Sequence, residues 1–373
     1  MKKFLSFFAF VAIMISFAAC GGGNEPELAT LQLKVQALSH KAYFVITPSA
    51  NNQQEYFFCW TRKSEVEEKG SVEDYAEYYL NGWSYENLNN FQLFRKGKME
   101  YCTAGDYYLV SNTTFVLFAC YIVKEGDKAK RVSDVESIEF TTLPEYTLNG
   151  EFTVDAQGKK VRFMQANMYQ PSNLSGLKLM ENQWDCVGSN SSYPRDLFTW
   201  DQAMNALPST APYHLLPANE WAYLFRERPN AERLFAHATL SIDGNDIHGL
   251  ILLPDNWEKP DDIQLTTDFE MEMLWDEQEE QYRKTGLDGY SVNNFDKDQW
   301  ESLEFAGAVF LPAAGSNVSD KNTYGNYWSS TPSGETDAHR FAFGSYYISL
   351  SCLYEWRTAR TYCHAVRPVR EIK

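Results

Sequence analysis

The chain has 373 residues, enough for two domains of ordinary size, and 44% of them are hydrophobic, enough to bury a sizeable core. The formal net charge of −17 argues against nucleic acid as a partner, because affinity for nucleic acid comes from lysines and arginines that neutralise phosphates, and it disfavours adhesion to an anionic membrane surface for the same reason. The 23 tyrosines suit both half-buried β structure and wet binding surfaces.

The first 19 residues have the pattern of a secretory signal peptide. The chain begins with Met and two lysines, and residues 4–17 form an uncharged apolar run that is too short for a comfortable transmembrane helix. The run ends in FAAC, with small residues before Cys20, which resembles the lipobox of bacterial lipoproteins. The resemblance implies cleavage before Cys20 and attachment to the membrane through lipid on its thiol. Ordinary cleavage that leaves Cys20 as a free thiol is the alternative.

Residues 20–28 are predicted to form a flexible, lipidated tether, because the sequence GGGNEPE is rich in glycine and polar residues. Its two acids, Glu25 and Glu27, resemble those of lipoproteins that are exported to the outer face of the outer membrane. We therefore expect a protein that is lipid-anchored in the outer membrane and exposed at the cell surface.

Residues 29–143 are predicted to form a β-rich domain. Runs of β-branched and aromatic residues, bounded by Pro, Asn and Gly, predict strands at 41–48, 55–61, 113–123 and 136–144. One helix is predicted after Ser71, where the sequence SVED is typical of a capping box. The series Leu109-x-Ser111-x-Thr113-x-Phe115 resembles the LxPxTxY corner of fibronectin type III domains, with Ser in place of Pro and Phe in place of Tyr. That resemblance implies a fibronectin type III-like β-sandwich, which usually serves as a spacer.

A new pattern begins after residues 141–150, where Pro and Gly flank a short polar linker. A hairpin is predicted around the turn at 155–158, and helices are predicted in DLFTWDQAMNAL and LPANEWAYLFRERP. An apolar strand is predicted in IHGLILLPDNW, ending at Pro254. Residues 264–290 form an acidic insert with seven acids between Asp268 and Glu280, which predicts a solvated helix or loop and marks no cation site.

Five ordered motifs mark the C-terminal half of the chain. They are YHLLPANEWAYLF (213–225), GAVFLPAAG (307–315), YGNYWSST (324–331), AHRFAF (338–343) and RTYCHAVRPVR (360–370). The series resembles the C-type-lectin-like fold as it is built in the formylglycine-generating-enzyme (sulfatase-modifying factor) branch, and it is most similar to bacterial families of unknown function in that branch. The resemblance covers residues 146–373, with the acidic insert outside it. The fold class that we expect is a β-rich N-terminal sandwich followed by an α+β C-type-lectin-like domain.

The enzymes of that branch generate formylglycine with two cysteines near the C-terminus that bind copper. Cys363 follows an aromatic residue as that family requires, but the second cysteine of the pattern falls at Pro368. A soft ion such as Cu(I) is held by two thiolates, so the departure argues against the oxidase activity. The histidines have no metal-ligand spacing, and the chain contains no nucleophile elbow, P-loop or dinucleotide-binding glycine motif. We expect no catalytic residues, no metal and no cofactor.

Calcium-dependent lectins of the wider fold use Glu-Pro-Asn or Gln-Pro-Asp together with Trp-Asn-Asp as ligands. Here Pro254 and Asp255 have no partner acceptor before them, and Trp-Asn-Asp is absent. Calcium takes six or more oxygen ligands, and the sequence does not assemble them. Calcium-dependent sugar binding is therefore not expected.

The disulfide state of the remaining cysteines stays open. No paired framework emerges from their spacing, although Cys352 and Cys363 could face each other across a hairpin. Free, buried thiols are the expectation for most of the set. Its members are Cys59, Cys102, Cys120, Cys186, Cys352 and Cys363.

The last 36 residues carry a local excess of positive charge, with six basic residues against two acids in a chain of net charge −17. Tyrosine, tryptophan and arginine are the usual anchors of binding surfaces, and they gather here. The predicted ligand-binding residues are Tyr346, Tyr347, Tyr354, Trp356, Arg357, Tyr362 and His364. Arg360, Arg367 and Trp328 occupy motif positions, so we expect Trp328 to be buried and the two arginines to pair with acids and fix the terminal strands.

These observations predict a cell-envelope lipoprotein whose C-terminal domain binds a glycan or protein ligand at the cell surface, without catalysis and without nucleic acid. A structural subunit of a surface assembly or fimbria tip is the main alternative. An oxidase of the formylglycine-generating type is a second, disfavoured alternative. Exposed aromatic residues on one face of the C-terminal domain favour ligand binding, whereas a large flat apolar patch or an unpaired edge strand favours assembly.

Overall fold

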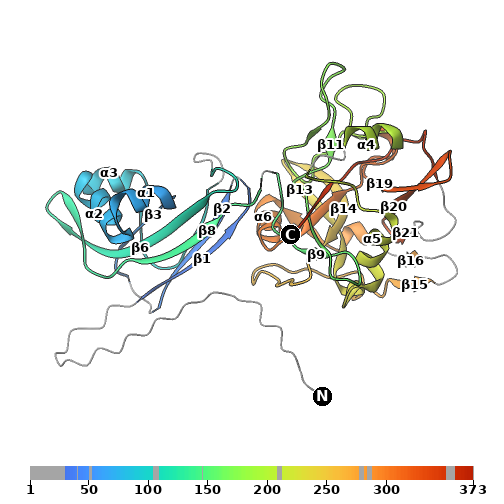
Figure 1. The fold of residues 1–373 in the computed structure, drawn as a ribbon. Helices are drawn as coiled ribbons and strands as arrows, with labels where there is room; N and C mark the ends of the chain where they lie inside the picture. Colours follow the sequence, from blue (N-terminus) through green and yellow to red (C-terminus); the bar gives the residue numbers. More distant parts are fainter. Residues whose placement is uncertain are drawn as a thin grey trace.

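The computed structural model describes residues 30–39, 41–49, 53–103, 109–144, 146–207, 212–276, 281–283, 288–349 and 358–372. Figure 1 shows two bodies side by side, which we call the first lobe (30–144) and the second lobe (146–372). Throughout the described ranges, each strand pairs with strands of its own lobe. The structure is β-rich and contains several separate sheets, as the sequence predicts at that level of detail. In this part of the chain, no helix is both long and apolar enough to cross a membrane.

The first lobe contains two sheets with apolar residues between them. One sheet has the order β1-β2-β5, and the other has the order β4-β3-β6-β7, with β8 also paired to β6. Phe44, Phe58 and Leu117 are among the buried residues between the sheets. The bounds of the strands are β1 (Leu31–Ala37), β2 (Ala42–Pro48), β3 (Tyr56–Arg62), β4 (Phe94–Arg95), β5 (Met99–Cys102), β6 (Thr114–Glu125), β7 (Lys128–Arg131) and β8 (Glu136–Thr141).

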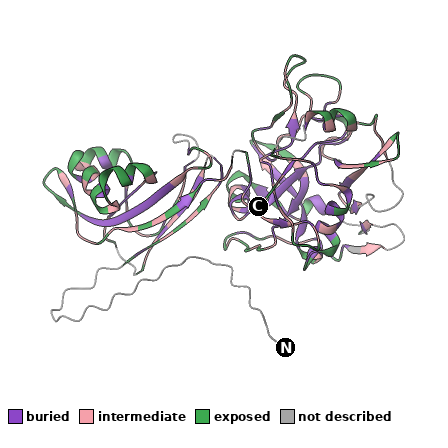
Figure 2. Ribbon diagram, viewed as in Figure 1, coloured by how far each residue is buried: buried purple, intermediate pink, exposed green. Residues whose placement is uncertain are grey.

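Three short helices, α1 (Lys63–Lys69), α2 (Val72–Gly82) and α3 (Tyr85–Asn90), pack on the other face of β3 and β6. Figure 2 shows their outer sides exposed and their inner sides in contact with the buried sheet. The predicted helix is α2, and the Ser71 side chain accepts the Asp74 N–H at its start, as the capping pattern requires. The other two helices were not predicted, because each contributes a single fully buried residue and has no apolar periodicity.

The second lobe is built from several small sheets. Three of them have the orders β23-β10-β9, β11-β12 and β17-β13-β14-β18. The fourth, which we call the C-terminal sheet, has the order β15-β16-β21-β20-β19, with β22 also paired to β20. The strand bounds are β9 (Phe152–Thr153), β10 (Lys160–Phe163), β11 (Met168–Tyr169), β12 (Lys178–Leu179), β13 (Phe235–Ile242), β14 (Asn245–Leu252), β15 (Leu274–Asp276), β16 (Gln281–Arg283), β17 (Asn294–Asp296), β18 (Val309–Pro312), β19 (Tyr324–Ser333), β20 (Asp337–Gly344), β21 (Tyr347–Ser349), β22 (Thr358–Ala359) and β23 (Val369–Glu371).

Two helical segments of this lobe were predicted from the sequence and correspond to α4 and to α5 with η1, whereas α6 was not predicted. Thr199 and Gln202 form a reciprocal capping box at the start of α4, and α5 continues into the π-helix η1 and ends before Pro229. The predicted hairpin is also confirmed, since Asp155 accepts two backbone N–H groups in the turn between β9 and β10. The helices are α4 (Trp200–Ala206), α5 (Ala218–Ala222), η1 (Tyr223–Glu227), η2 (Ala231–Arg233), η3 (Gly289–Ser291), α6 (Lys297–Phe305) and η4 (Val318–Asp320).

The prediction for the acidic insert was wrong in part. Its described residues include β15 and β16, which form a hairpin that extends the C-terminal sheet beyond β21. Asp268 is fully buried, and the Tyr282 hydroxyl donates a hydrogen bond to the Phe225 carbonyl. The apolar residues Met271 and Met273, which alternate with acids in the sequence, are buried as well. The acids therefore lie around a packed element rather than in a solvated loop.

Candidate functional site

The C-terminal sheet has one apolar face and one mixed face. Because successive side chains of a strand point to opposite sides, Tyr327, Phe341 and Phe343 face the core of the second lobe, where the Phe341 ring stacks on Trp221 with centroids 4.8 Å apart. The residues between them belong to the opposite side, which we call the outer face. Because the core side is filled, a ligand would approach from the outer face, where Tyr324 is exposed and Tyr347 half-buried, whereas Asn326, Trp328 and Ala342 are buried.

A row of paired residues crosses the outer face from strand to strand. In the antiparallel register Tyr324 pairs with Gly344, Gly344 pairs with Tyr347, and Tyr347 pairs with Arg283. Directly paired residues lie on the same side of a sheet, so these side chains share the outer face. We call Tyr324, Tyr347 and the neighbouring Tyr346 the tyrosine row.

The rings of the tyrosine row lie close together at the surface. The Tyr324 and Tyr347 centroids are 6.4 Å apart, and those of Tyr346 and Tyr347 are 5.6 Å apart. Tyr324 is 37% exposed and Tyr346 is 44% exposed, whereas Tyr347 is half-buried. Gly344 makes this arrangement possible, because a Cβ atom there would lie 2.6 Å from Cε1 of Tyr347 and 3.0 Å from Cδ1 of Tyr324. Burial raises the pKa of the Tyr347 hydroxyl to about 12, so this group is a neutral donor and acceptor.

Polar groups flank the tyrosine row on the same face. Asn326 and Ser349 both pair with Ala342, one step along the strands. The Arg340 guanidinium donates a 2.8 Å hydrogen bond to the Thr358 hydroxyl and another to the side-chain oxygen of Asn326. Burial lowers the pKa of Arg340 from its usual value, with little offset from neighbouring charge. The outer face therefore presents the tyrosine rings beside a buried amide and a half-buried guanidinium that are hydrogen-bonded to each other.

The predicted ligand-binding residues are only partly brought together. Tyr346 and Tyr347 lie in the tyrosine row. Tyr354, Trp356 and Arg357 fall outside the described residues, although Ser349 before them and Thr358 after them both lie on strands that pair with β20. Tyr362 is 60% exposed in the turn after β22, and across the described ranges no ring contact joins it to the tyrosine row.

His364 does not belong to a surface. It is 2% exposed, its ring centroid is 4.3 Å from that of Trp328, and its backbone forms a two-way bridge with Phe198. Burial is the main reason that its pKa is lowered to about 3. The prediction failed here because His364 belongs to the inward-facing pattern of the terminal motif, in which Ala365 and Val366 are also buried.

The motif arginines bind carbonyl groups rather than acids. Arg360 donates to the carbonyl oxygens of Asp337 and Gly334 and lies 4.3 Å over the Trp200 ring. Arg367 is 1% exposed and donates 2.8 Å to the Gln183 side-chain oxygen. Our expectation of acid partners was therefore wrong for these contacts, whereas the predicted burial of Trp328 is confirmed.

The described cysteines are free thiols, and they are Cys59, Cys102, Cys120, Cys186 and Cys363. Cys352 lies outside the described residues, and so does its possible pairing with Cys363. Burial raises the pKa of Cys186 to about 12 and also raises that of Cys363, so both favour the protonated thiol. Within the described ranges, no three His, Cys, Asp or Glu side chains are grouped as a metal site requires.

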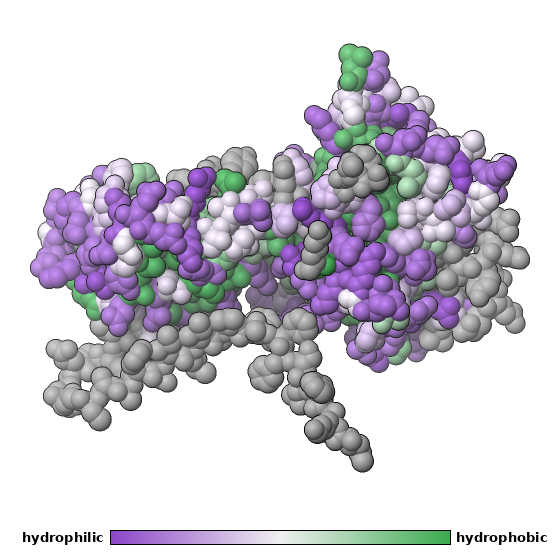
Figure 3. Space-filling view, viewed as in Figure 1, coloured by the Kyte–Doolittle hydropathy of each residue, from purple (hydrophilic) through white to green (hydrophobic). Residues whose placement is uncertain are grey.

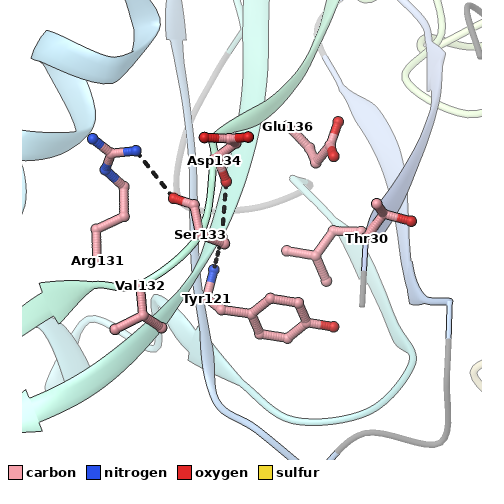
Figure 4. A pocket seen from close by; sticks show the side chains of 8 residues that line it. Thr30, Tyr121, Arg131, Val132, Ser133, Asp134 and Glu136 are labelled. Atoms are coloured by element: carbon pink, nitrogen blue, oxygen red, sulfur yellow. Dashed lines mark hydrogen bonds between the residues drawn. The ribbon is translucent and has the colours of Figure 1, made fainter. Parts of the chain in front are cut away.

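The first lobe contains a cavity of about 520 Å³ at one end of its sheets, shown in Figure 4. Leu31 and Tyr121 form apolar lining, and Asp134 and Glu136 supply carboxylates. Arg131 is already engaged, since its Nε lies 2.9 Å from Glu77 and its Nη1 donates to the Ser133 carbonyl. The cavity thus mixes apolar and acidic lining without the grouped ligands of a metal centre.

Two residues of the outer face were missed from sequence. Tyr324 was part of the motif that we assigned to the framework, and Arg283 lay in the insert that we excluded. The alternation of polar and apolar residues through 324–349 could have revealed the outer face, but the pairing of Arg283 with Tyr347 joins residues 64 positions apart and leaves no local signal.

No protein-family model matches the chain, and no curated protein matches it.

Proposed function

We propose that the chain is a cell-envelope lipoprotein whose second lobe binds a glycan or protein ligand at the tyrosine row, without catalysing a reaction. The observation that carries the proposal is the set of three neighbouring tyrosine rings, of which those of Tyr324 and Tyr347 lie over Gly344. Tyrosine provides a large, amphipathic contact area at a low cost in conformational entropy, so it is frequent in binding surfaces. Its ring can stack on the apolar face of a sugar or on a protein side chain.

The proposal also includes the fold of each lobe and the location of the protein in the cell envelope. The paired sheets of the first lobe support a fibronectin type III-like domain, here with three added helices. The ordered motifs of the second lobe, which lie on α5, β18, β19 and β20, support a C-type-lectin-like domain of the formylglycine-generating-enzyme branch. Lipidation of Cys20 and exposure outside the outer membrane rest on the leader and tether sequences.

The distribution of hydrophobic residues favours ligand binding over assembly. On the face of the molecule shown in Figure 3, hydrophobic residues form small groups among hydrophilic ones rather than one broad patch. A subunit of a surface assembly would bury such a patch against its neighbour. The exposed tyrosines of the described residues are spread over both lobes, and two of them, Tyr324 and Tyr346, lie beside the half-buried Tyr347 in the tyrosine row.

The proposal is tested by comparing residues 21–373 with a Tyr324→Ala/Tyr347→Ala double variant on glycan and host-protein arrays. We expect the parent to bind a restricted set of ligands and the double variant to bind them at least about tenfold more weakly, since loss of binding-surface anchors typically costs more than 1 kcal/mol each. Tyr78→Ala is the matched control, because Tyr78 is an exposed tyrosine on α2 of the first lobe.

Equal binding by the parent and the double variant would overturn the assignment of the site. If the parent binds no array ligand but self-associates in sedimentation experiments, the assembly alternative replaces the proposal. Thermal unfolding of the double variant checks that the lobe remains folded.

A further inference from the structure

The two lobes meet at the C-terminal end of α6, which Figure 1 shows at their junction. Lys41 of the first lobe places its Nζ 2.7 Å from Oε2 of Glu304 and 5.4 Å from the centre of the Phe305 ring. The Tyr43 ring of the first lobe lies 5.4 Å from the same Phe305 ring. An ion pair and a ring contact thus converge on two neighbouring residues of the second lobe.

The segment that connects the two lobes is hydrogen-bonded to a lobe at each of its ends. Leu143 is still bound to the first lobe, because its N–H donates to the Leu38 carbonyl, and the Tyr146 carbonyl already accepts the Gln165 N–H of the second lobe. Further along, the Asn149 side chain donates to the Phe305 carbonyl at 3.2 Å. The predicted polar linker is therefore held by hydrogen bonds to both lobes, close to α6.

Glu304 begins a series of buried, hydrogen-bonded polar side chains that extends into the core of the second lobe. It is 5% exposed, and its Oε1 accepts a 2.9 Å hydrogen bond from Nε2 of Gln183. The side-chain oxygen of Gln183 accepts the N–H of Phe310 and a 2.8 Å hydrogen bond from Arg367. Gln183 is fully buried, and Arg367 is 1% exposed.

The charged side chains of this hydrogen-bonded series come from both lobes. A buried carboxylate is strongly unfavourable unless a cation or hydrogen bonds compensate it. Arg367 reaches Glu304 only through the amide of Gln183, whereas Lys41 contacts the carboxylate directly. Burial lowers the pKa of Lys41, but the charge of Glu304 and its hydrogen bond outweigh that effect and leave the pKa raised, so the lysine stays protonated.

We infer that the first lobe is a structural part of the second, because Lys41 supplies the direct counter-charge for the buried carboxylate of Glu304. The two lobes then unfold as one cooperative unit, and the outer face is held at a fixed angle to the first lobe. This role differs from that of a spacer, which would tolerate loss of the contact. It stands independently of the ligand that the tyrosine row binds.

The inference is tested with the variants Lys41→Met, Glu304→Gln and their combination, by hydrogen exchange of residues 21–373. Lys41→Met leaves Glu304 buried without its cation, so we expect exchange to speed up by about tenfold or more at residues 304–310 of the second lobe. The double variant should recover most of this protection, because a neutral amide in place of the carboxylate needs no cation. Lys34→Met is the matched control, since Lys34 is an exposed lysine of β1.

Several results would overturn the inference. They are the same exchange at 304–310 in Lys41→Met and Lys34→Met, a change confined to the first lobe, or separate unfolding transitions for the two lobes of the parent. If Lys41→Met does not fold at all, the double variant decides: a folded double variant supports the inference, and an unfolded one contradicts it.

Discussion

His364 shows how a titratable residue can be part of the core. Its imidazole lies against Trp328, and neither ring nitrogen has a hydrogen-bond partner in the structure as described. Burial lowers its pKa to about 3, and the positive charge of Arg340 acts in the same direction. The folded protein therefore keeps this histidine neutral at pH values where an unfolded chain would protonate it.

This difference predicts a loss of stability in acid. The unfolded histidine titrates near pH 6.5, so between about pH 6.5 and 3 the unfolded state binds a proton that the folded state does not, and the free energy of unfolding falls by about 1.4 kcal/mol per pH unit as the pH decreases. A His364→Phe variant keeps a ring against Trp328 and cannot titrate. We expect it to lose about 2.5 kcal/mol less than the parent between neutral pH and about pH 4.5, as measured by urea unfolding. Because the two proteins share every other titrating group, parallel pH profiles would contradict the prediction.

Gly344 sets the spacing of the tyrosine row. A Gly344→Ala variant places a Cβ within 2.6 Å of the Tyr347 ring and 3.0 Å of the Tyr324 ring, so at least one ring must move. We expect ligand binding to weaken about tenfold, with a smaller effect on stability because the Tyr324 ring is at the surface and can rotate away. Array binding and thermal unfolding measure the two effects separately. The control Gly82→Ala adds a methyl group where nothing lies within 4 Å, so equal behaviour of the two variants would argue against a role for this spacing.

At the scale of single residues, the sequence predicted burial better than partners. Trp328 was correctly placed in the core because it occupies an apolar framework motif. The partners of Arg360 and Arg367 were predicted wrongly, since a guanidinium can also donate to carbonyl oxygens and to a side-chain amide oxygen. Composition does not distinguish these cases.

At the scale of the elements, one buried pair of side chains anchors the acidic insert to β13. His237 on β13 and Asp268 of the insert are both fully buried, with Nδ1 and Oδ2 2.7 Å apart. Asp268 also accepts the backbone N–H of His237 at 2.9 Å. Contacts of this insert with η1 add to the attachment, including the Arg226 guanidinium 4.0 Å over the Trp275 ring.

An Asp268→Asn variant should therefore loosen the insert. The substitution removes the negative charge from a buried hydrogen-bonded pair, and we expect the free energy of unfolding to fall by about 2 kcal/mol, with faster hydrogen exchange at residues 266–276. Asp261→Asn is the control, because Asp261 is an exposed acid of the preceding loop. A similar loss of stability in both variants would show that the pair is not the anchor.

Local patterns explain which elements could be predicted. Helix α2 and the hairpin of β9 and β10 have their signals within a few residues, as capping or turn residues next to an apolar pattern. The hairpin of β15 and β16 could not be recognised, because each strand has only three residues, too few for an alternating pattern, and because its neighbour in the sheet, β21, is remote in the sequence.

For the whole molecule, the joint between the lobes is the part that no sequence pattern predicted. The β-rich character of the chain follows from composition and local periodicity. The Lys41–Glu304 pair joins residues 263 positions apart, and each side chain alone reads as an ordinary surface charge. The outer face is likewise assembled from strands of the insert and of the terminal motifs, so only its tyrosines could be suspected beforehand.

The short strand β15 gives the molecule a further property. It forms one edge of the C-terminal sheet, spans only Leu274–Asp276 and pairs with β16 alone in that sheet. Short edge strands with adjoining acids are poor templates for another chain, since few backbone groups are available and like charges repel a second copy. The insert therefore protects this edge of the sheet from pairing with another chain.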